Sequence, residues 1–289
     1  MKPAPFEYAD PRSIDETLSL LARYGDDAKI LAGGQSLVPM LNFRLARPAM
    51  IVDVNRVDGL DALAATGGTL RAGALVRQRR LEVWAREHSP VLATALALVG
   101  HAAIRNRGTV AGSVVHADPA AELPALLLAL DGAAVARSAR GERAIPAADL
   151  FQGPLTTSLA ADELVTETRW TLPRPDQGWG FHEVARRHGD FALVGAVAVA
   201  GLRGGRIEDA CIVVFGAGPT PRRLTTVERA LAGHTPTLTS LREVAESACR
   251  ELDSHTDLHA TSEYRRAVAA TLVTRALGDT IGRAKDQAR

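Results

Sequence analysis

Two adjacent glycines stand between an expected strand and an expected helix near the start of the chain. The segment Ala32-Gly33-Gly34-Gln35-Ser36 follows an apolar run and precedes one with helical spacing. Residues without side chains can adopt positive φ and bring backbone N–H groups against a diphosphate. The Ser36 hydroxyl can cap the helix or donate to a phosphate. The same pattern is also that of an ordinary turn, so it allows a phosphate site without requiring one.

A second glycine-containing segment, Thr109-Val110-Ala111-Gly112-Ser113, again combines hydroxyl groups with small residues. We expect a loop here, and two such loops could hold one dinucleotide from opposite sides. Glu122 begins an apolar helix soon afterwards, and its carboxylate could accept hydrogen bonds from ribose hydroxyls. The alternative is that Glu122 is simply a helix N-terminal acid favoured by the helix dipole.

The periodicity of the chain predicts that helices and strands position these segments in three parts, which places the fold in the α+β class. The predicted segments are 1–57, a small β-α-β unit; 58–176, a mixed middle part; and 177–289, a hairpin followed by helices. The predicted helices lie at 13–24, 36–45, 81–88, 90–104, 122–130, 224–232, 239–252 and 261–276. The predicted strands lie at 29–31, 50–54, 69–72 and 162–172, with two more inside 192–218 and a turn-rich linker at 172–180.

Three motifs occur in a characteristic order: AGGQSLVPMLNFRL from residue 32, IRNRGTVAGSVVHADPAAELP from residue 104, and ARRHGDFALVGAVAVA from residue 185. Together they resemble the FAD-binding medium subunit of carbon-monoxide-dehydrogenase and xanthine-dehydrogenase-like molybdenum hydroxylases, over residues 3 to about 285. The resemblance implies a vanillyl-alcohol-oxidase (PCMH)-type FAD-binding fold with a C-terminal domain of antiparallel sheet plus helices. FAD would lie between the first two parts.

The resemblance also implies which residues contact the FAD. Those residues are Leu31, Ala32, Gly33, Gly34, Gln35, Ser36, Leu37, Gly100, His101, Thr109, Ala111, Gly112, Ser113, Asp118, Glu122, Leu164, Val165 and Phe191. The first loop would wrap the pyrophosphate, the second would bind it from the middle part, and Asp118 or Glu122 would hold ribose or nearby polar groups. Leu164 and Val165 would border the flavin or the adenine.

Two positions depart from the family pattern. Ala111 stands where glycine is common, so that peptide must tolerate a Cβ, and Phe191 replaces a frequent tyrosine, which removes a hydroxyl. We expect FAD binding to survive both changes and redox tuning to differ. Phe191 would lie beside the isoalloxazine ring; the alternative is that it begins the core of the third segment.

By resemblance, the chain is an oxidoreductase subunit that passes electrons from iron–sulfur clusters of a partner through FAD to an external acceptor. Its partners would be a large molybdopterin-binding subunit and a small 2Fe-2S subunit, in a dimer of heterotrimers. Two alternatives stay open: a self-sufficient flavin oxidase or reductase of the same fold, and an interaction subunit without flavin.

Composition agrees with the resemblance. A net charge of +1 without a run of Lys and Arg argues against nucleic acid, and Cys211 and Cys249 are too far apart in sequence for a cluster or zinc motif. No apolar stretch of about 18 residues occurs, so we expect a cytoplasmic protein without a membrane segment. Gly-Ala-Gly at 216–218 is followed by prolines where a dinucleotide-binding helix would begin, and the histidines lack metal-ligand spacing, so we expect no Rossmann site and no metal.

Overall fold

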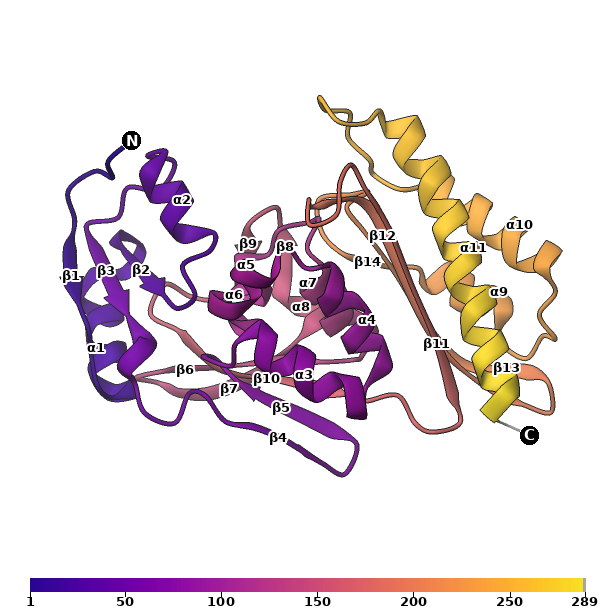
Figure 1. Ribbon diagram of the computed structural model, residues 1–289, viewed down its shortest axis with the longest axis horizontal. Coiled ribbons are helices and arrows are strands. Elements are labelled where there is room, and N and C mark those ends of the chain that lie inside the picture. Colours follow the sequence, from indigo (N-terminus) through magenta and orange to yellow (C-terminus); the bar gives the residue numbers. More distant parts are fainter. Residues whose placement is uncertain (288–289) are drawn as a thin grey trace.

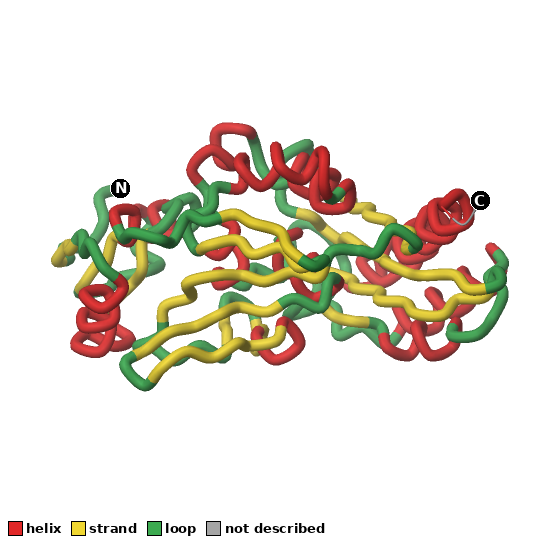
Figure 2. The backbone as a smooth tube through the Cα atoms, turned by 90° about the horizontal axis from the view of Figure 1, so that it is seen from below, coloured by secondary structure: helices red, strands yellow, loops and turns green. Residues whose placement is uncertain are grey.

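The computed structural model describes residues 1–287, in which three β-sheets follow one another along the long axis of the molecule (Figure 1). A two-stranded sheet is added to the middle part. The strands of the middle sheet run along this long axis, whereas those of the first and third sheets run across it (Figure 1), and in Figure 2 most helices lie outside the strands. The α+β class is therefore as predicted.

The first sheet has three parallel strands in the order β1-β3-β2. Its part of the chain contains β1 (Glu7–Ala9), α1 (Ile14–Tyr24), β2 (Ala28–Leu31), α2 (Leu37–Asn42) and β3 (Met50–Asp53), with 3-10 turns at Gly25–Asp27 and Val54–Arg56. Ser13 caps α1 by accepting a hydrogen bond from the Glu16 N–H at 3.1 Å. The Glu16 carboxylate accepts from the Arg12 N–H instead of the Ser13 N–H, so only half of a capping box forms.

The middle sheet has five antiparallel strands in the order β4-β5-β10-β6-β7. Its helices are α3 (Gln78–His88), α4 (Pro90–Leu98), α5 (Ala102–Arg107), α6 (Val110–His116), α7 (Glu122–Ala129) and α8 (Ala147–Leu150). Its strands are β4 (Leu63–Thr66), β5 (Thr69–Gly73), β6 (Ala133–Ser138), β7 (Gly141–Pro146) and β10 (Leu164–Thr171), and β8 (Phe151–Gly153) pairs with β9 (Thr156–Thr157).

The third sheet is antiparallel in the order β11-β12-β13-β14 and carries helices on its outer face (Figure 1). Its elements are β11 (Gln177–Ala185), β12 (Ala192–Arg203), β13 (Arg206–Phe215), β14 (Arg222–Arg223), α9 (Thr225–Leu231), α10 (Leu238–Arg250) and α11 (Ser262–Gln287). The inner face packs on the middle part, and one continuous core runs from the first part to this face. A second core lies between the outer face and the three helices.

Several sequence expectations were wrong. The helix expected at 90–104 is two helices, because the chain turns at Gly100, where φ is +48°. The loop expected at 109–113 is the start of helix α6, with Thr109 as its N-cap. The linker expected at 172–180 already contains β11, whose Gly178 and Gly180 lack the Cβ atoms that would overlap the Thr280 and Ala276 carbonyls of α11.

The last helix also continues beyond its expected end at 276, to Gln287. No helix within residues 1–287 combines the length and apolar character needed to cross a bilayer.

Candidate functional site

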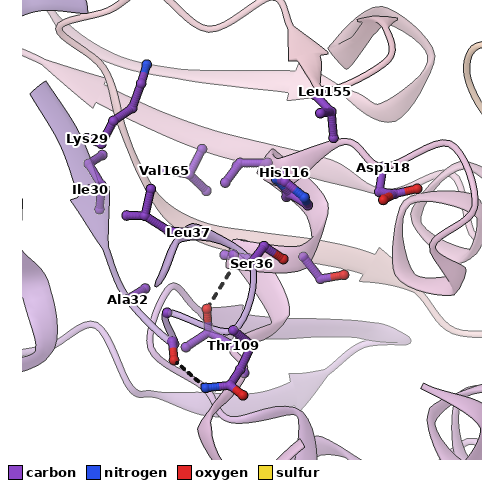
Figure 3. Close-up of a pocket in the computed structure, with 18 of the residues that line it drawn as sticks. Lys29, Ile30, Ala32, Ser36, Leu37, Thr109, His116, Asp118, Leu155 and Val165 are labelled. Carbon is purple, nitrogen blue, oxygen red and sulfur yellow. Dashed lines mark hydrogen bonds between the residues drawn. The ribbon is translucent and has the colours of Figure 1, made fainter. Parts of the chain in front are cut away.

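A cavity of about 610 Å³ lies where the first part of the chain meets the middle part. Its volume falls in the range of roughly 300–1,000 Å³ that is usual for small-molecule and cofactor sites. Figure 3 shows Ala32, Ser36 and Leu37 of the first loop around the same hollow as Thr109 and His116. Sixteen of the eighteen predicted residues line it: Ala32, Gly33, Gly34, Gln35, Ser36, Leu37, Gly100, Thr109, Ala111, Gly112, Ser113, Asp118, Glu122, Leu164, Val165 and Phe191.

Leu31 and His101 do not line the cavity but pack behind residues that do. The Leu31 side chain lies beneath Gly34, and the His101 ring lies against Gly189. The two glycines therefore rest on these side chains, which places Leu31 and His101 in a supporting position.

The two glycines of the first loop are required for different reasons. A Cβ on Gly33 would stand 2.6 Å from the Arg107 carbonyl oxygen and 2.7 Å from the Gly108 Cα, so Gly33 lets two backbones touch. Gly34 has φ of +73°, a conformation that L side chains rarely adopt. The backbone N–H groups of Gly34, Gln35 and Ser36 donate to no acceptor within residues 1–287, which leaves three adjacent donors beside the cavity.

Asn55 and Arg77 tie the two glycine segments together. The Asn55 amide donates to the Ala32 carbonyl at 2.8 Å, and Arg77 donates to the Asn55 Oδ1 at 2.7 Å and to the Arg107 carbonyl at 2.5 Å. Burial is the main cause that lowers the pKa of Arg77. Neither residue belongs to the three sequence motifs, so only the tertiary structure identifies this link.

In the second segment, Gly112 is required because a Cβ at this position would overlap the Thr109 side chain. Thr109 caps α6 by accepting a hydrogen bond from the Gly112 N–H at 3.1 Å, and a Cβ on Gly112 would stand 2.5 Å from the Thr109 Oγ1. Ala111, where the family pattern often has glycine, is buried in the first turn of α6 with an ordinary helical backbone. The Cβ of Ala111 is thus accommodated by the helix.

The third motif reaches the cavity from the C-terminal sheet, through the turn between β11 and β12. Gly189 has φ of +86° and Phe191 is 61% exposed, which contradicts the alternative that Phe191 begins a core. Phe191, Gly189 and Asp118 also line a second cavity of about 580 Å³. The segment therefore borders two hollows, one of which is the predicted cofactor site.

The acids of the site lie in contrasting surroundings. The Asp118 Oδ1 accepts a hydrogen bond from the Ala120 N–H at 2.9 Å. The Asp118 Oδ2 does not take part in this hydrogen bond. Glu122 is the first residue of α7, as predicted, but it is only 4% exposed. Burial, followed by the charges of Glu183 and Asp118, raises the pKa of Glu122 to about 8, so desolvation outweighs any stabilisation by the helix dipole.

Sequence reasoning missed several lining residues, among them Lys29, His116 and Leu155 (Figure 3). Lys29 brings a positive charge to the wall, and its position three residues before the glycine loop was the only sequence signal. Leu155 adopts φ of +55° and is half exposed, although the sequence gives no sign of this backbone conformation.

The arrangement suits an anionic dinucleotide better than a metal. Unpaired backbone donors, a lysine and apolar side chains line one hollow, and these are the groups that a diphosphate with flanking rings requires. Within residues 1–287, no group of three or more His, Cys, Asp or Glu side chains is placed to hold a metal ion.

Comparison with known proteins gives the same answer over nearly the whole chain. Residues 4–174 match the family model of the FAD binding domain in molybdopterin dehydrogenase, and residues 179–280 match the CO dehydrogenase flavoprotein C-terminal domain. The alpha subunit of the 6-hydroxypseudooxynicotine dehydrogenase complex of Paenarthrobacter nicotinovorans is 41% identical over 99% of this chain and 97% of its own length. The caffeine dehydrogenase beta subunit of a Pseudomonas species is 40% identical, with coverage of 96% and 95%.

Solved structures agree with these matches. Carbon monoxide dehydrogenase from Hydrogenophaga pseudoflava superimposes with a TM-score of 0.95 at 33% identity, covering 98% of this chain and 99% of that one. Quinoline 2-oxidoreductase from Pseudomonas putida 86 gives 0.92 at 34% identity, covering 98% and 99%. The predicted fold and the predicted cofactor, FAD, are thereby confirmed. The chain belongs to the FAD-binding medium subunits of the carbon-monoxide-dehydrogenase-like molybdenum hydroxylases, and it is an oxidoreductase flavoprotein subunit.

Proposed function

We propose that this chain holds FAD with its diphosphate against the loop at 32–36 and receives electrons there from iron–sulfur clusters of a partner. The observation that carries the proposal is the set of three adjacent backbone donors, on Gly34, Gln35 and Ser36, beside a cavity of about 610 Å³. When bound, FAD accepts and returns electrons, and the protein contributes position and electrostatic tuning. Lys29 places a cation on the same wall, which favours an anionic ligand.

The predicted contact residues have separate roles in this proposal. Ala32 to Leu37 hold the pyrophosphate from the first part, and Thr109, Ala111, Gly112 and Ser113 face it from α6 and its cap. Leu164 and Val165, at the start of β10, supply an apolar wall for a ring, while Asp118 and Glu122 face polar atoms. Phe191 borders the flavin from the third part, with Gly100, His101 and Leu31 supporting these segments.

We infer that the partners are a large molybdopterin-binding subunit and a small 2Fe-2S subunit, assembled as a dimer of heterotrimers. Several relatives carry names that describe them as medium chains or as subunits of a dehydrogenase, which supports a multi-subunit assembly. Electrons would leave the FAD for an external acceptor, and the second cavity lined by Phe191 offers one approach to the cofactor site.

The alternative of a self-sufficient oxidase is separated from this proposal by one experiment. The isolated chain, loaded with FAD, is mixed with candidate substrates of the complex, such as N-heterocycles, and the flavin absorbance is followed. We expect almost no substrate-dependent bleaching by the isolated chain and rapid bleaching by the complete complex. Turnover by the isolated chain would support the self-sufficient enzyme instead.

The division of the chain is likewise a proposal: 1–57 and 58–176 as two FAD-binding subdomains, and 177–289 as the C-terminal domain, whose last two residues lie outside the described ones. Each range holds one of the three larger sheets, which supports the division. A cytoplasmic location is supported by Cys211 and Cys249, which are buried and unpaired. Limited proteolysis and cell fractionation test the two proposals.

A further inference from the structure

Glu183 is an acidic residue at a position of β11 where an apolar residue is expected. Alternate residues of β11 face the middle part, and the two preceding ones on this face, Trp179 and Phe181, pack against the large core. Glu183 is the next residue of β11 on this face after Trp179 and Phe181. Its Oε2 atom is buried and has no hydrogen-bond partner.

Strand pairing places Glu183 beside Gly195 of β12, and Gly195 beside Phe215 of β13. The next residue, Gly216, donates a hydrogen bond to the Pro119 carbonyl at 2.7 Å, which holds the segment before Glu122, at the wall of the cofactor cavity, against this part of the sheet. Glu122 is 4% exposed, and neither carboxylate forms an ion pair within residues 1–287. The negative charge of Glu183 is the second largest cause of the raised pKa of Glu122, after burial. Burial also raises the pKa of Glu183, to about 7. A buried carboxyl group beside a partly buried one, with no cation paired to either, disfavours the state in which both are ionised.

The contrast with Glu163 shows that burial alone does not produce this state. Glu163 is 8% exposed and lines the same cavity, but its carboxylate is bridged by Arg143 at 2.7 and 2.8 Å. This bridge is the main cause that lowers the pKa of Glu163. Glu122 and Glu183 have no such partner.

We propose that Glu122 and Glu183 share protons at neutral pH, so that Glu122 presents a carboxylic acid rather than a carboxylate to the FAD cavity. Glu183 is then a positioning residue, because it acts on the cofactor only through Glu122. A neutral acid can donate a hydrogen bond to an acceptor atom of FAD, whereas a carboxylate can only accept one. The proposal rests on the proposed FAD site, and it adds the protonation state of the Glu122 side chain at the wall of that site.

The charged groups around the pair give it no counter-charge. Asp118, on the segment before α7, adds negative charge, and Asp190 and His116 line the same cavity. On the opposite face of β11, His182 contacts Asp279 of α11. Arg283 of α11 lies over the ring of Trp179, four residues before Glu183, and forms an ion pair with Asp279 at 3.7 Å rather than with Glu183.

The first test needs no cofactor. Infrared spectra of the apoprotein are recorded from about pH 6 to about pH 9, the range that brackets the two raised pKa values. We expect a protonated-carboxyl band that disappears as the pH rises, is reduced in Glu122→Gln and in Glu183→Gln, and is retained in the control Glu163→Gln. In Glu183→Gln the remaining Glu122 band should titrate at lower pH, because a like charge has been removed.

The second test measures FAD affinity over the same pH range. For the wild type we expect the affinity to fall about tenfold as Glu122 ionises, which corresponds to one lost hydrogen bond to a charged or polar acceptor. Glu122→Gln should bind FAD with little pH dependence, since its amide still donates. If the pair has only a structural role, the pH dependence of FAD affinity should be the same in Glu122→Gln as in the wild type.

The outcomes are distinct. Absence of the infrared band at about pH 6, or an unchanged Glu122 titration in Glu183→Gln, overturns the proposal whether or not FAD binds. If the band behaves as expected but FAD affinity is independent of pH, the pair shares protons without serving the cofactor, and the FAD part of the proposal is wrong. If one variant fails to fold, the other still reports through its own band.

Discussion

The cofactor cavity has one wall that is held by close backbone contacts and one that carries an exposed aromatic side chain. At the junction of the two glycine segments, backbone meets backbone at Gly33 and Gly108, and Asn55 and Arg77 add three hydrogen bonds. The turn at 186–191 reaches the same cavity from the third sheet with a 61% exposed Phe191. The difference suggests that changes at the junction will lower stability and FAD binding together, while changes at the turn will alter the cofactor alone.

Gly33→Ala should lower both stability and FAD binding more than any other variant considered. If it does not, the proposed contrast between the junction and the turn at 186–191 is wrong. The added Cβ meets two backbone atoms of residues 107 and 108, which cannot move without separating the two segments. We expect a loss of about 3 kcal/mol in the free energy of unfolding, the upper end of the usual cost of overpacking, together with loss of bound FAD. Calorimetry and the flavin absorbance of the purified protein measure both.

A matched control for this glycine is Gly278→Ala in helix α11, where an added Cβ meets nothing within 4 Å. It should bind FAD normally and be as stable as the wild type or slightly more so. A Gly33→Ala protein with full FAD content and an unchanged melting temperature would show that the junction is not rigid.

Asn55→Ala should have the next largest effect. It removes the donor to the Ala32 carbonyl and the acceptor of Arg77, so a partly buried guanidinium loses a partner. We expect about 1–3 kcal/mol of destabilisation and about tenfold weaker FAD binding. Titration of apoprotein with FAD measures the second quantity.

The control at the neighbouring position is Arg56→Ala. Arg56 forms an ion pair with Asp10 at 2.9 Å, but its side chain is 58% exposed, so its removal should change stability by less than about 1 kcal/mol. Equal effects of the two variants would mean that Asn55 acts only as a surface residue.

Gly34→Ala sharpens the comparison within the loop. Its φ of +73° costs an alanine about 1–2 kcal/mol, but the nearest atoms, the Leu31 Cδ1 and Val38 Cγ2, are ends of flexible side chains. We therefore expect a milder loss than for Gly33→Ala, and a smaller one again for Gly34→Asn, because asparagine tolerates this conformation better. Urea denaturation should rank the three variants in this order; a reversed order of alanine and asparagine would exclude backbone strain as the cause.

The sequence predicted the fold where local patterns and family motifs coincide. Helix α1, strand β3 and the β12-β13 hairpin follow from hydrophobic spacing and turn residues, and sixteen of the eighteen predicted residues line one cavity. Prediction from the sequence failed where a contact with a distant residue determines the conformation. Gly178 and Gly180 were predicted to lie in a linker because their partners, Thr280 and Ala276, lie about a hundred residues away in the sequence. Asn55 and Arg77 were not predicted because they belong to no motif.

Phe191→Ala should have the smallest effect on stability and the most selective effect on the cofactor. An aromatic ring that is 61% exposed contributes little to the core, so we expect less than about 0.5 kcal/mol of change in the free energy of unfolding. If Phe191 packs beside the flavin, as we propose, its removal exposes one side of the ring system to water. The reduction potential should then shift, or FAD affinity should fall, without a matching fall in melting temperature.

Two further variants at this position separate ring packing from polarity. Phe191→Leu keeps apolar area but loses the aromatic face, and Phe191→Tyr keeps the ring and adds the hydroxyl that is frequent in the family. Potentiometric titration of the FAD in each variant should place tyrosine nearest to phenylalanine in affinity, with its own shift in potential. If alanine, leucine and tyrosine all leave the potential and the affinity at wild-type values, the turn only covers the second cavity, and the exposed wall of the site must be assigned to another segment.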